Sequence, residues 1–304
     1  MGEVRAALDC GTNSTRLLVV DAAGNPLERR MTITRLGAGV DATGTLSEAA
    51  MVRVVEALGA YAEVMAAHGV VRGRMACTSA VRDATNGAEF LRRASAAAGV
   101  EAELLDGQEE AALTYQGATA ALPPARGPRL VVDVGGGSTE LVLDQGGRLE
   151  SCSLQLGCVR LTERCLLGDP PTAASILEAR GVVAAELDRA QVEMAHLGRT
   201  APPEVVGTAG TVATLVQLVF GLEGYERDLV HHQVVERAQL AAWIDRLSIE
   251  PVSQRRAHRG MDPGRADVLL GGLLVLAGVL DLVGADQLVS SEDDLLDGLV
   301  ASLR

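Results

Sequence analysis

Short aliphatic runs alternate along this chain with longer stretches in which apolar residues recur at helical spacing. Runs such as Arg16–Val20 and Leu141–Leu143 have the length and composition of strands. Ser47 precedes a helical pattern that continues to Met65, and the pair His68-Gly69 follows it as a stop signal. We therefore expect an α/β protein whose helices each bury one face.

Further stretches with helical periodicity predict more helices. They span Asn86–Ala97, Glu109–Ala121, Ala174–Leu197, Val212–Val219, Ala238–Leu247 and Asp294–Leu303. The uninterrupted apolar run Val268–Leu280 has thirteen residues, which is too short to cross a bilayer. We expect this run to form a helix that is buried in the core.

Two glycine-rich turns that begin with aspartate carry the strongest chemical signal. The first is Asp9-Cys10-Gly11-Thr12-Asn13-Ser14-Thr15, and the second is Asp133-Val134-Gly135-Gly136-Gly137-Ser138-Thr139-Glu140. Glycine lets successive backbone amides approach an anion, and the small hydroxyl side chains add donors. Each leading aspartate stands where a divalent cation bound to that anion would lie. The pair of turns predicts a phosphate clamp.

The two halves of the chain follow the same plan. In each half the glycine-rich turn leads into a strand and then a hairpin turn, at 21–25 and at 144–147. A later strand enters a turn that contains Thr78 in one half and Thr208 in the other. We interpret this as a duplicated domain with a linker at Leu122–Pro128. The predicted domains are residues 1–123 and 124–304, and the final helix could pack back on the first.

Size, charge and composition limit the possible ligands. The 304 residues suffice for two domains of about 150 residues, and the six aromatic residues offer few platforms for stacking bases. A formal charge of −13 disfavours attraction to nucleic acid or anionic membranes. All 27 basic residues are arginine, which excludes the lysine of a Walker P-loop and Schiff-base chemistry. We expect neither a nucleic-acid nor a membrane partner.

Cysteine usage favours a reducing compartment. The five cysteines form no C-x-x-C pair and no signal peptide is evident, so we expect the protein to be cytoplasmic. Cys10 lies inside the first turn, where we interpret it as a small buried residue and not as a nucleophile. His231, His232 and His258 do not have the spacing of a zinc site.

These motifs resemble the Ppx/GppA family of exopolyphosphatases and guanosine pentaphosphate phosphohydrolases, which belongs to the actin, sugar-kinase and Hsp70 superfamily. Besides the two turns, blocks similar to the family's own follow in the same order: Thr78–Ala84, Gly107–Ala111, Leu156–Glu163, Gly207–Thr211 and Asp262–Asp267. The resemblance implies an α/β fold of two similar ribonuclease H-like (actin-like ATPase) domains with mixed sheets flanked by helices. It also implies an active site in the interdomain cleft and, commonly, a homodimer.

The resemblance further implies that terminal phosphoanhydride bonds of inorganic polyphosphate are hydrolysed to release orthophosphate. This reaction needs a positioned phosphoryl group, compensation of its charge and an aligned water. We expect Mg²⁺ or another divalent cation at Asp9, Asp133 and Glu140, because only hard oxygen ligands are offered. The expected phosphate-binding residues are Gly11, Thr12, Asn13, Ser14, Arg16, Gly135, Gly136, Gly137, Ser138 and Thr139.

Glu110 and Arg82 are the expected catalytic residues. Glu110 matches the family glutamate that directly precedes the alanine of its block, and we expect it to activate water. Glu109 is the competing candidate, since either glutamate could simply interact with a helix N-terminus. Arg82 would compensate the charge of the transferred phosphoryl group, with a surface ion pair to Asp83 as the alternative.

Other residues are expected to line the site. They are Thr78, Ser79, Thr208, Gly210, Thr211 and Arg265. Relatives with a nucleoside ligand hold it at the position of Thr208–Thr211, although Gly210 could merely permit a turn. Arg255, Arg256 and Arg259 could form a groove for a polyanion or belong to an ordinary exposed face.

Two departures from the family bear on the substrate. The family often ends in Gly-Leu-Arg-Glu-Gly, whereas this chain has the acidic stretch Asp293–Gly298 without that arginine. Longer relatives also carry an added helical domain that this sequence lacks. Both departures make processive action on very long polymers less expected, and short polyphosphates or nucleotide phosphates more so.

Several alternatives remain open at this point. Within the same chemistry they are removal of the 5′ γ-phosphate from pppGpp and hydrolysis of ADP or ATP. Outside it stand a sugar or acid kinase and a non-catalytic sensor of phosphate or nucleotide. A kinase would need an aspartate base beside an acceptor hydroxyl, and a sensor would not need Glu110, so the sequence favours a hydrolase.

Overall fold

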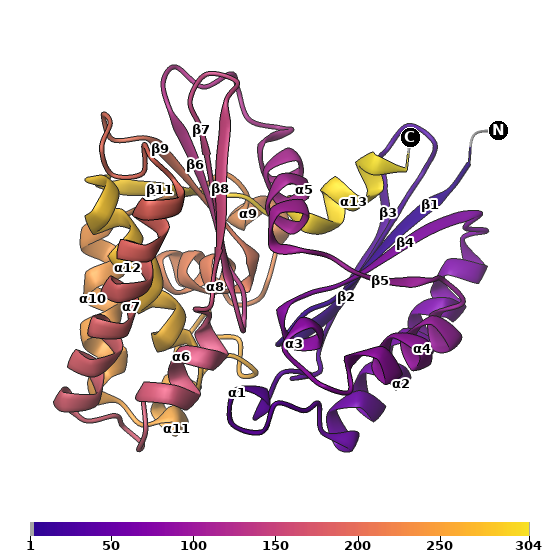
Figure 1. Cartoon of the computed structure of the whole chain (residues 1–304), viewed down its shortest axis with the longest axis horizontal. Helices are drawn as coiled ribbons and strands as arrows, with labels where there is room; N and C mark the ends of the chain where they lie inside the picture. Colours follow the sequence, from indigo (N-terminus) through magenta and orange to yellow (C-terminus); the bar gives the residue numbers. More distant parts are fainter. Residues whose placement is uncertain (1–2, 304) are drawn as a thin grey trace. The chain divides into compact units, whose positions relative to one another are not determined.

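The protein is described here by a computed structural model that covers residues 3–303 (Figure 1). Its contacts divide the chain into two units. Unit 1 contains the described residues up to Gly117 together with those from Asp293 onward, and unit 2 contains Ala118–Glu292. The predicted ranges, 1–123 and 124–304, include residues 1, 2 and 304, which lie outside the described residues.

Unit 1 is built on a five-stranded mixed sheet in the order β3-β2-β1-β4-β5. Strands β1, β2 and β3 form an antiparallel meander, whereas β4 and β5 run parallel to β1. The strands are β1 (Arg5–Cys10), β2 (Ser14–Val20), β3 (Pro26–Ile33), β4 (Arg72–Cys77) and β5 (Ala102–Leu104).

Helices cover both faces of this sheet. Helices α2 (Glu48–Ala67) and α4 (Gly87–Ala98) pack against each other, and their apolar residues join those of one face (Figure 1). On the other face, α5 (Gly107–Thr119) and α13 (Leu295–Ser302) bury Leu113, Leu296 and Leu299 against strand residues. Two four-residue helices complete the unit, α1 (Val40–Thr43) and α3 (Ser79–Arg82).

Helices α5 and α13 meet through glycine. A Cβ atom added at Gly298 would overlap the carbonyl group of Leu113, and one added at Gly117 would overlap the carbonyl group of Asp294. The two helix backbones therefore approach more closely than any side chain would permit. This contact explains why the last residues of the chain belong to unit 1.

Unit 2 is built on a six-stranded mixed sheet in the order β10-β11-β9-β6-β7-β8. Strands β6, β7 and β8 again form an antiparallel meander, and β9 and β11 extend the sheet in parallel with β6. The strands are β6 (Arg129–Val134), β7 (Thr139–Asp144), β8 (Leu149–Leu154), β9 (Glu204–Thr208), β10 (Val234–Glu236) and β11 (Gln287–Ser290).

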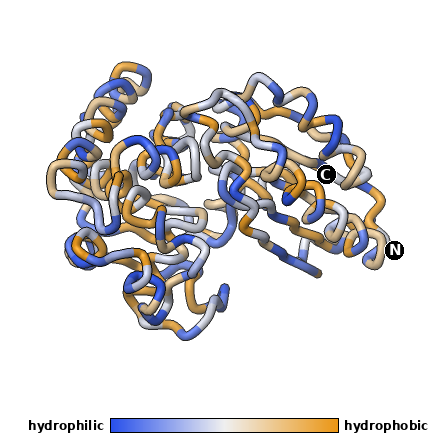
Figure 2. The backbone as a smooth tube through the Cα atoms, turned by 90° about the horizontal axis from the view of Figure 1, so that it is seen from below, coloured by the Kyte–Doolittle hydropathy of each residue, from blue (hydrophilic) through white to orange (hydrophobic). Residues whose placement is uncertain are grey.

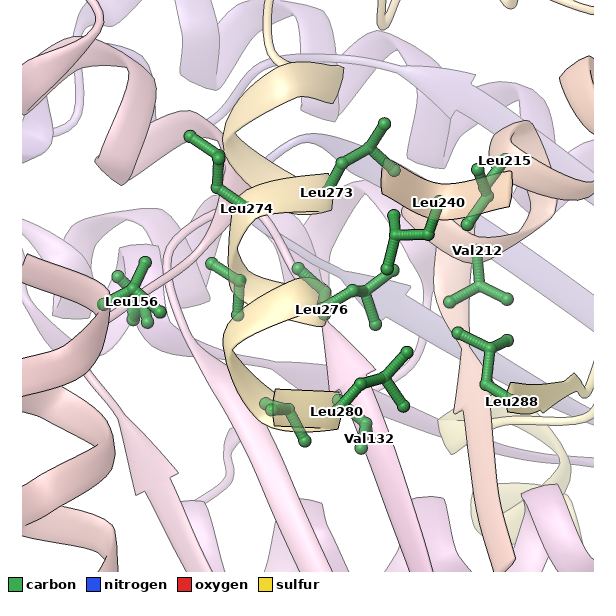
Figure 3. Close-up of a cluster of buried hydrophobic side chains, with 14 of the residues drawn as sticks. Val132, Leu156, Val212, Leu215, Leu240, Leu273, Leu274, Leu276, Leu280 and Leu288 are labelled. Carbon is green, nitrogen blue, oxygen red and sulfur yellow. The ribbon is translucent and has the colours of Figure 1, made fainter. Parts of the chain in front are cut away.

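A central apolar helix, α12 (Leu269–Val283), organises the core of unit 2. Its leucines pack against β6 and against neighbouring helices (Figure 3), and Val132, Leu215 and Leu240 are among their partners. The other helices are α6 (Cys158–Cys165), α7 (Ala173–Glu193), α8 (Ala209–Phe220), α9 (Arg227–Val230), α10 (Arg237–Ile249) and α11 (Val252–Arg255). The expectation of a buried core helix at this run is confirmed.

The two sheets share one plan, as a duplication predicts. In both units an antiparallel meander is extended by parallel strands on the side of its first strand. The hairpin turn after β2 is held by Asp21, which accepts from the amides of Ala23 and Asn25, and Asp144 accepts from the amide of Gly147 in unit 2. The predicted α/β class with two mixed sheets flanked by helices is confirmed.

Most predicted helices are present with shifted ends. Ser47 caps α2 by accepting from the amide of Ala50, and Gly69 after this helix has a φ of 66°. The helix α6 was not predicted. The division between the units falls after Gly117, inside α5, whose start packs on the sheet of unit 1. The predicted linker at 122–128 stays a prediction.

Hydropathy along the backbone follows this architecture. Figure 2 shows hydrophobic and hydrophilic positions alternating along the helices, as expected for helices with one buried face. Among residues 3–303, no helix is both long and apolar enough to cross a membrane. All five cysteines are buried and unpaired by disulfides, and Cys10 is the small buried residue that we expected.

Candidate active site

The first glycine-rich turn, residues 11–13 or loop 1, joins β1 to β2 in unit 1. The amide of Gly11 donates to the carbonyl of Ser14 at 3.0 Å, which closes the turn. The amides of Thr12 and Asn13 donate to no acceptor among the described residues, although both residues are buried. Unpaired buried amides are rare, so loop 1 has donors available to an anion.

Polar side-chain atoms near loop 1 also lack partners. Among the described residues, Oδ1 of Asp9, both carboxamide atoms of Asn13 and Nη2 of Arg82 are buried without a hydrogen bond. Leaving such a group unpaired costs about 1–3 kcal/mol, and native proteins contain few of them. Their gathering in unit 1, at the ends of β1 and β4, marks a place that is built to hold a polar ligand.

Sheet register explains why these groups gather. Cys10 of β1 lies beside Cys77 of β4, and Cys77 lies beside Leu104 of β5. Because the three strands are parallel, the segments that follow them emerge at one edge of the sheet. Loop 1 and the turn after β4 are joined there by a 2.9 Å hydrogen bond between the hydroxyls of Thr12 and Ser79.

Arg82 and Glu110 form a partly buried ion pair at this edge. Arg82 ends α3, and Nη1 donates to the carbonyl of Leu105 at 3.1 Å. The same Nη1 lies 3.5 Å from Oε2 of Glu110, whose carboxyl group is almost fully buried in the first turn of α5. Arg82 thus pairs with Glu110 itself.

The neighbouring glutamate has a different environment. Glu109 is exposed, and Oε1 accepts from Nη2 of Arg74 at 2.7 Å. Arg74 also pairs with Glu103. Only Glu110 of the two adjacent glutamates is buried beside Arg82, so the geometry favours Glu110 over Glu109 as the catalytic candidate.

Arg16 lies between two carboxylates of unit 1. Its Nε and Nη2 donate to Oδ2 of Asp9 at 2.9 and 2.7 Å, and its Nη1 donates to Oδ2 of Asp294. Burial raises the pKa of Asp9 against the opposing effect of Arg16, and Asp294 adds to the rise. Burial alone would raise the pKa of Asp294, but Arg16 and Arg29 together lower it. Arg16, predicted to bind phosphate, thus has carboxylate partners.

A second arginine–carboxylate pair lies beside the first. Nη2 of Arg29 donates to Oδ1 of Asp297 at 2.6 Å and lies 3.9 Å from Asp293. Asp297 also accepts from the amide of Asp294 at 2.9 Å and so forms a capping box at the start of α13. Burial, with smaller contributions from Asp294 and Asp293, raises the pKa of Asp297 to about 6 although Arg29 opposes the shift.

This raised pKa predicts a pH-dependent contribution to stability. The folded protein binds the Asp297 proton more tightly than the unfolded chain, so the carboxyl group costs stability as the pH rises from about 4 through about 6. The free energy of unfolding of Asp297→Asn, relative to that of the wild type, should therefore rise by on the order of 2 kcal/mol between pH 4.5 and pH 7.5. Urea unfolding of both proteins at the two pH values measures this difference. A pH-independent difference, or one of opposite sign, would contradict the assignment.

The second glycine-rich turn, residues 135–138 or loop 2, repeats the geometry of loop 1 in unit 2. The amide of Gly135 donates to the carbonyl of Ser138 at 3.1 Å. The amides of Gly136 and Gly137 donate to no acceptor among the described residues. Ser138 and Thr139 are buried, and the Thr139 hydroxyl donates to the carbonyl of Leu156 at 2.5 Å.

The first amides of helix α6 donate to carbonyl groups of loop 2 and hold the loop in place. The amide of Cys158 donates to the carbonyl of Gly135, and the amides of Val159 and Arg160 donate to that of Gly136. A Cβ atom at Gly157 would overlap the backbone of Gly136. The Leu156–Glu163 block therefore holds loop 2 in place, a role that the sequence alone did not reveal.

Thr208, Gly210, Thr211 and Arg265 also gather in unit 2. Thr208 precedes α8, and Ala209 adopts a left-handed φ of 66° where β9 turns into that helix. The guanidinium group of Arg265 fills the space where Gly210 lacks a Cβ atom. Thr211 donates to the carbonyl of Val134 at 3.2 Å, directly before loop 2. Gly210 is thus required for the approach of Arg265 and does more than permit a turn.

The predicted metal ligands fall in both units. Asp9 is in unit 1, whereas Asp133 and Glu140 are cross-strand neighbours in unit 2, where the Ser153 hydroxyl donates to Oε1 of Glu140 at 2.8 Å. Over residues 3–303, no three or more His, Cys, Asp or Glu side chains are arranged to hold a metal ion. A shared role of these three residues in binding Mg²⁺ stays a prediction.

The arginines near residue 255 have separate environments. Arg255 is buried, and its Nε donates to the carbonyl groups of Leu247 and Glu250 at the end of α10. Burial lowers the pKa of its guanidinium group. Arg259 pairs with Glu223 at 3.3 Å. Arg255 therefore cannot contribute to an exposed basic groove.

Comparison with known proteins identifies the family. The model of the Ppx/GppA phosphatase family matches residues 18–304. The chain belongs to this family. Its members are phosphatases, and the protein is an enzyme of that class.

Three relatives illustrate the range of the family. The chain is 41% identical to exopolyphosphatase 2 of Mycobacterium tuberculosis over 318 residues, which cover 98% of each chain. It is 31% identical to the guanosine-5′-triphosphate,3′-diphosphate pyrophosphatase of Vibrio cholerae, over 97% of this chain and 58% of that protein. A solved exopolyphosphatase-like protein is 35% identical and superimposes with a TM-score of 0.93 over 99% of this chain and 98% of its own.

Proposed function

We propose that this protein hydrolyses the terminal phosphoanhydride bond of inorganic polyphosphate and releases orthophosphate. The observation that carries the proposal is a set of unpartnered polar groups in unit 1: the amides of Thr12 and Asn13, and the buried side-chain atoms of the Asn13 carboxamide, Oδ1 of Asp9 and Nη2 of Arg82. Hydrogen-bond donors that could bind an anion therefore lie in the same unit as a carboxylate oxygen that could bind a cation. The 41% identity to an exopolyphosphatase supports polyphosphate as the substrate.

In this proposal the described residues divide the work. The amides of loop 1 and loop 2 would hold phosphoryl oxygens, and Nη2 of Arg82 would compensate the charge that develops on the transferred group. Glu110 would accept a proton from the attacking water, since its carboxylate is buried and held 3.5 Å from Arg82. Arg82 would thereby contact both the phosphoryl group and Glu110, the proposed general base.

A divalent cation fits the chemistry of these residues. Oδ1 of Asp9 is a buried carboxylate oxygen without a partner among the described residues, and hard oxygen ligands of this kind suit Mg²⁺. Asp9, Asp133 and Glu140 are the residues that would hold it. When bound, the cation would neutralise phosphoryl oxygens. The rest of the chemistry falls to Glu110, Arg82 and the two loops.

A second candidate function is removal of the 5′ γ-phosphate from pppGpp. The 31% identity to a guanosine-5′-triphosphate,3′-diphosphate pyrophosphatase supports it. Hydrolysis of ADP or ATP would use the same residues. A non-catalytic sensor is the alternative of another class, and the partly buried Glu110–Arg82 pair speaks against it.

Phosphate release from matched substrates tests the proposal. Polyphosphates of defined length, pppGpp, ATP and ADP would be compared with the full chain, with Mg²⁺ and with EDTA. We expect kcat/KM for a short polyphosphate to exceed that for each nucleotide at least tenfold, and EDTA to abolish release. A preference for pppGpp would select the second candidate, and no release from any substrate would contradict both.

A further inference from the structure

Three carboxylates and two arginines form two neighbouring sets of ion pairs in unit 1. The order is Asp9, Arg16, Asp294, and beside it Arg29 and Asp297. The side chains of Arg16, Asp9 and Asp294 are 16%, 5% and 6% exposed. Charges buried to this degree are costly unless they are paired, so Arg16, Asp9 and Asp294 depend on one another for their ionised state and position.

Arg16 fixes the carboxylate of Asp9 in one orientation. Two donors of Arg16, Nε and Nη2, both bind Oδ2 of Asp9, at 2.9 and 2.7 Å. The other oxygen, Oδ1, is thereby left without a hydrogen bond among the described residues. Oδ1 is the atom through which Asp9 would bind a ligand. The orientation of Arg16 therefore determines whether the Asp9 carboxylate is oriented for binding.

Asp294 fixes Arg16 in turn. It accepts from Nη1, the edge of the guanidinium group that does not contact Asp9. Asp294 is itself held rigidly, because its Oδ1 accepts from the amide of Leu296 and its own amide donates to Asp297 at the start of α13. The helix is anchored by the glycine contact with α5. The start of the final helix therefore contacts Arg16 of β2 through the side chain of Asp294.

We propose that Asp294 is a positioning residue, which holds Asp9 in its reactive orientation by fixing the guanidinium group of Arg16. This inference rests on the proposed hydrolysis of a phosphoanhydride bond. Asp294 does not touch the substrate. Its effect passes through Arg16.

Asp294→Asn is the decisive variant, because asparagine keeps the helix cap and nearly the same shape but removes the charge. We expect kcat for polyphosphate to fall at least tenfold, KM to change less than threefold, and the melting temperature to remain within a few degrees. The matched control is Asp297→Asn, whose carboxamide oxygen can still accept from the amide of Asp294. This variant removes only the charge that is paired with Arg29, so kcat should stay within twofold of the wild type. Wild-type kcat in Asp294→Asn, or an equal loss in both variants, would overturn the proposal.

A double-mutant cycle tests whether Asp294 acts through Arg16. Lysine at position 16 cannot bridge both carboxylates, so Arg16→Lys should lower kcat as well. If the two residues act in series, the double variant should be no more than twofold worse than the poorer single variant. Losses that multiply would show independent roles and overturn the proposal.

The side chain of Arg16 gives a readout that needs no substrate. In the wild type its Nε–H group should exchange slowly with solvent in NMR spectra, assigned by its absence in Arg16→Lys. Asp294→Asn should accelerate this exchange at least tenfold. Unchanged exchange would overturn the positioning role, whereas a wild type that hydrolyses no phosphoanhydride would overturn only the proposed function.

Discussion

Glu110→Gln is expected to lower kcat for phosphate release from polyphosphate by about 10²–10⁴-fold, the range in which a general base contributes. Glutamine is almost the same size as glutamate, so the packing of α5 against the sheet should survive. It cannot accept a proton from water at neutral pH. Binding should change little, because the proposed phosphate contacts come from the loops and Arg82. Steady-state kinetics and calorimetric binding of a short polyphosphate measure the two effects.

The adjacent glutamate provides the matched control. Glu109→Gln alters an exposed carboxylate that pairs with Arg74, and an exposed ion pair contributes little. Its kcat should remain within about twofold of the wild type. Normal turnover by Glu110→Gln, or a collapse of turnover in Glu109→Gln alone, would show that the base has been assigned to the wrong residue.

Gly298→Ala is expected to destabilise unit 1 by about 3 kcal/mol, at the upper end of the usual cost of overpacking. The added methyl group would overlap the carbonyl of Leu113 in α5. A backbone group cannot move aside as the end of a flexible side chain can, so α13 would have to shift as a whole. Asp294 and its contact with Arg16 would shift with it. The free energy of unfolding, measured by chemical denaturation, and kcat should therefore both decrease.

Gly59→Ala offers a control in the same unit. Gly59 lies within α2, and a Cβ atom added there would meet nothing within 4 Å. Alanine is the better helix former by about 1 kcal/mol, so this variant should be as stable as the wild type or more so. Equal stability of Gly298→Ala and the wild type would mean that α5 and α13 do not meet as described.

Local patterns in the sequence were sufficient to predict the parts of the fold that depend on neighbouring residues. Loop 1 and loop 2 each combine an aspartate, glycine and small hydroxyls directly after a strand, and both turns close with the same hydrogen bond. The Ser47 cap and the Asp21 hairpin turn likewise depend on residues within a few positions. Turns and helix caps of this kind can be predicted from the sequence because the interacting groups are close in the chain.

The sequence did not predict interactions between distant residues. Arg16 and Asp294 are 278 positions apart, and Arg29 and Asp297 are 268 apart. Only the return of α13 to unit 1, through the close contact at Gly298, brings them together. The sequence therefore predicted phosphate binding by Arg16 without its carboxylate partners, and the acidic ending was noted only as a departure from the family. Arg255 looked like part of a basic strip because its burial depends on the carbonyl groups of α10.

Helix α6 was missed for a related reason. It has only eight residues, too few for a clear periodic pattern. Its start is fixed by the carbonyl groups of Gly135 and Gly136, which accept from its first amides. The block was recognised by its resemblance to the family, but its role in supporting loop 2 depends on contacts that no local pattern encodes.

The central claim is that water, directed by Glu110, attacks the terminal phosphoryl group. Hydrolysis of a short polyphosphate in H₂¹⁸O, followed by mass spectrometry of the orthophosphate, tests it most directly. The account predicts one ¹⁸O atom in each orthophosphate released and none in the shortened chain. Label in the chain, or unlabelled orthophosphate, would contradict it.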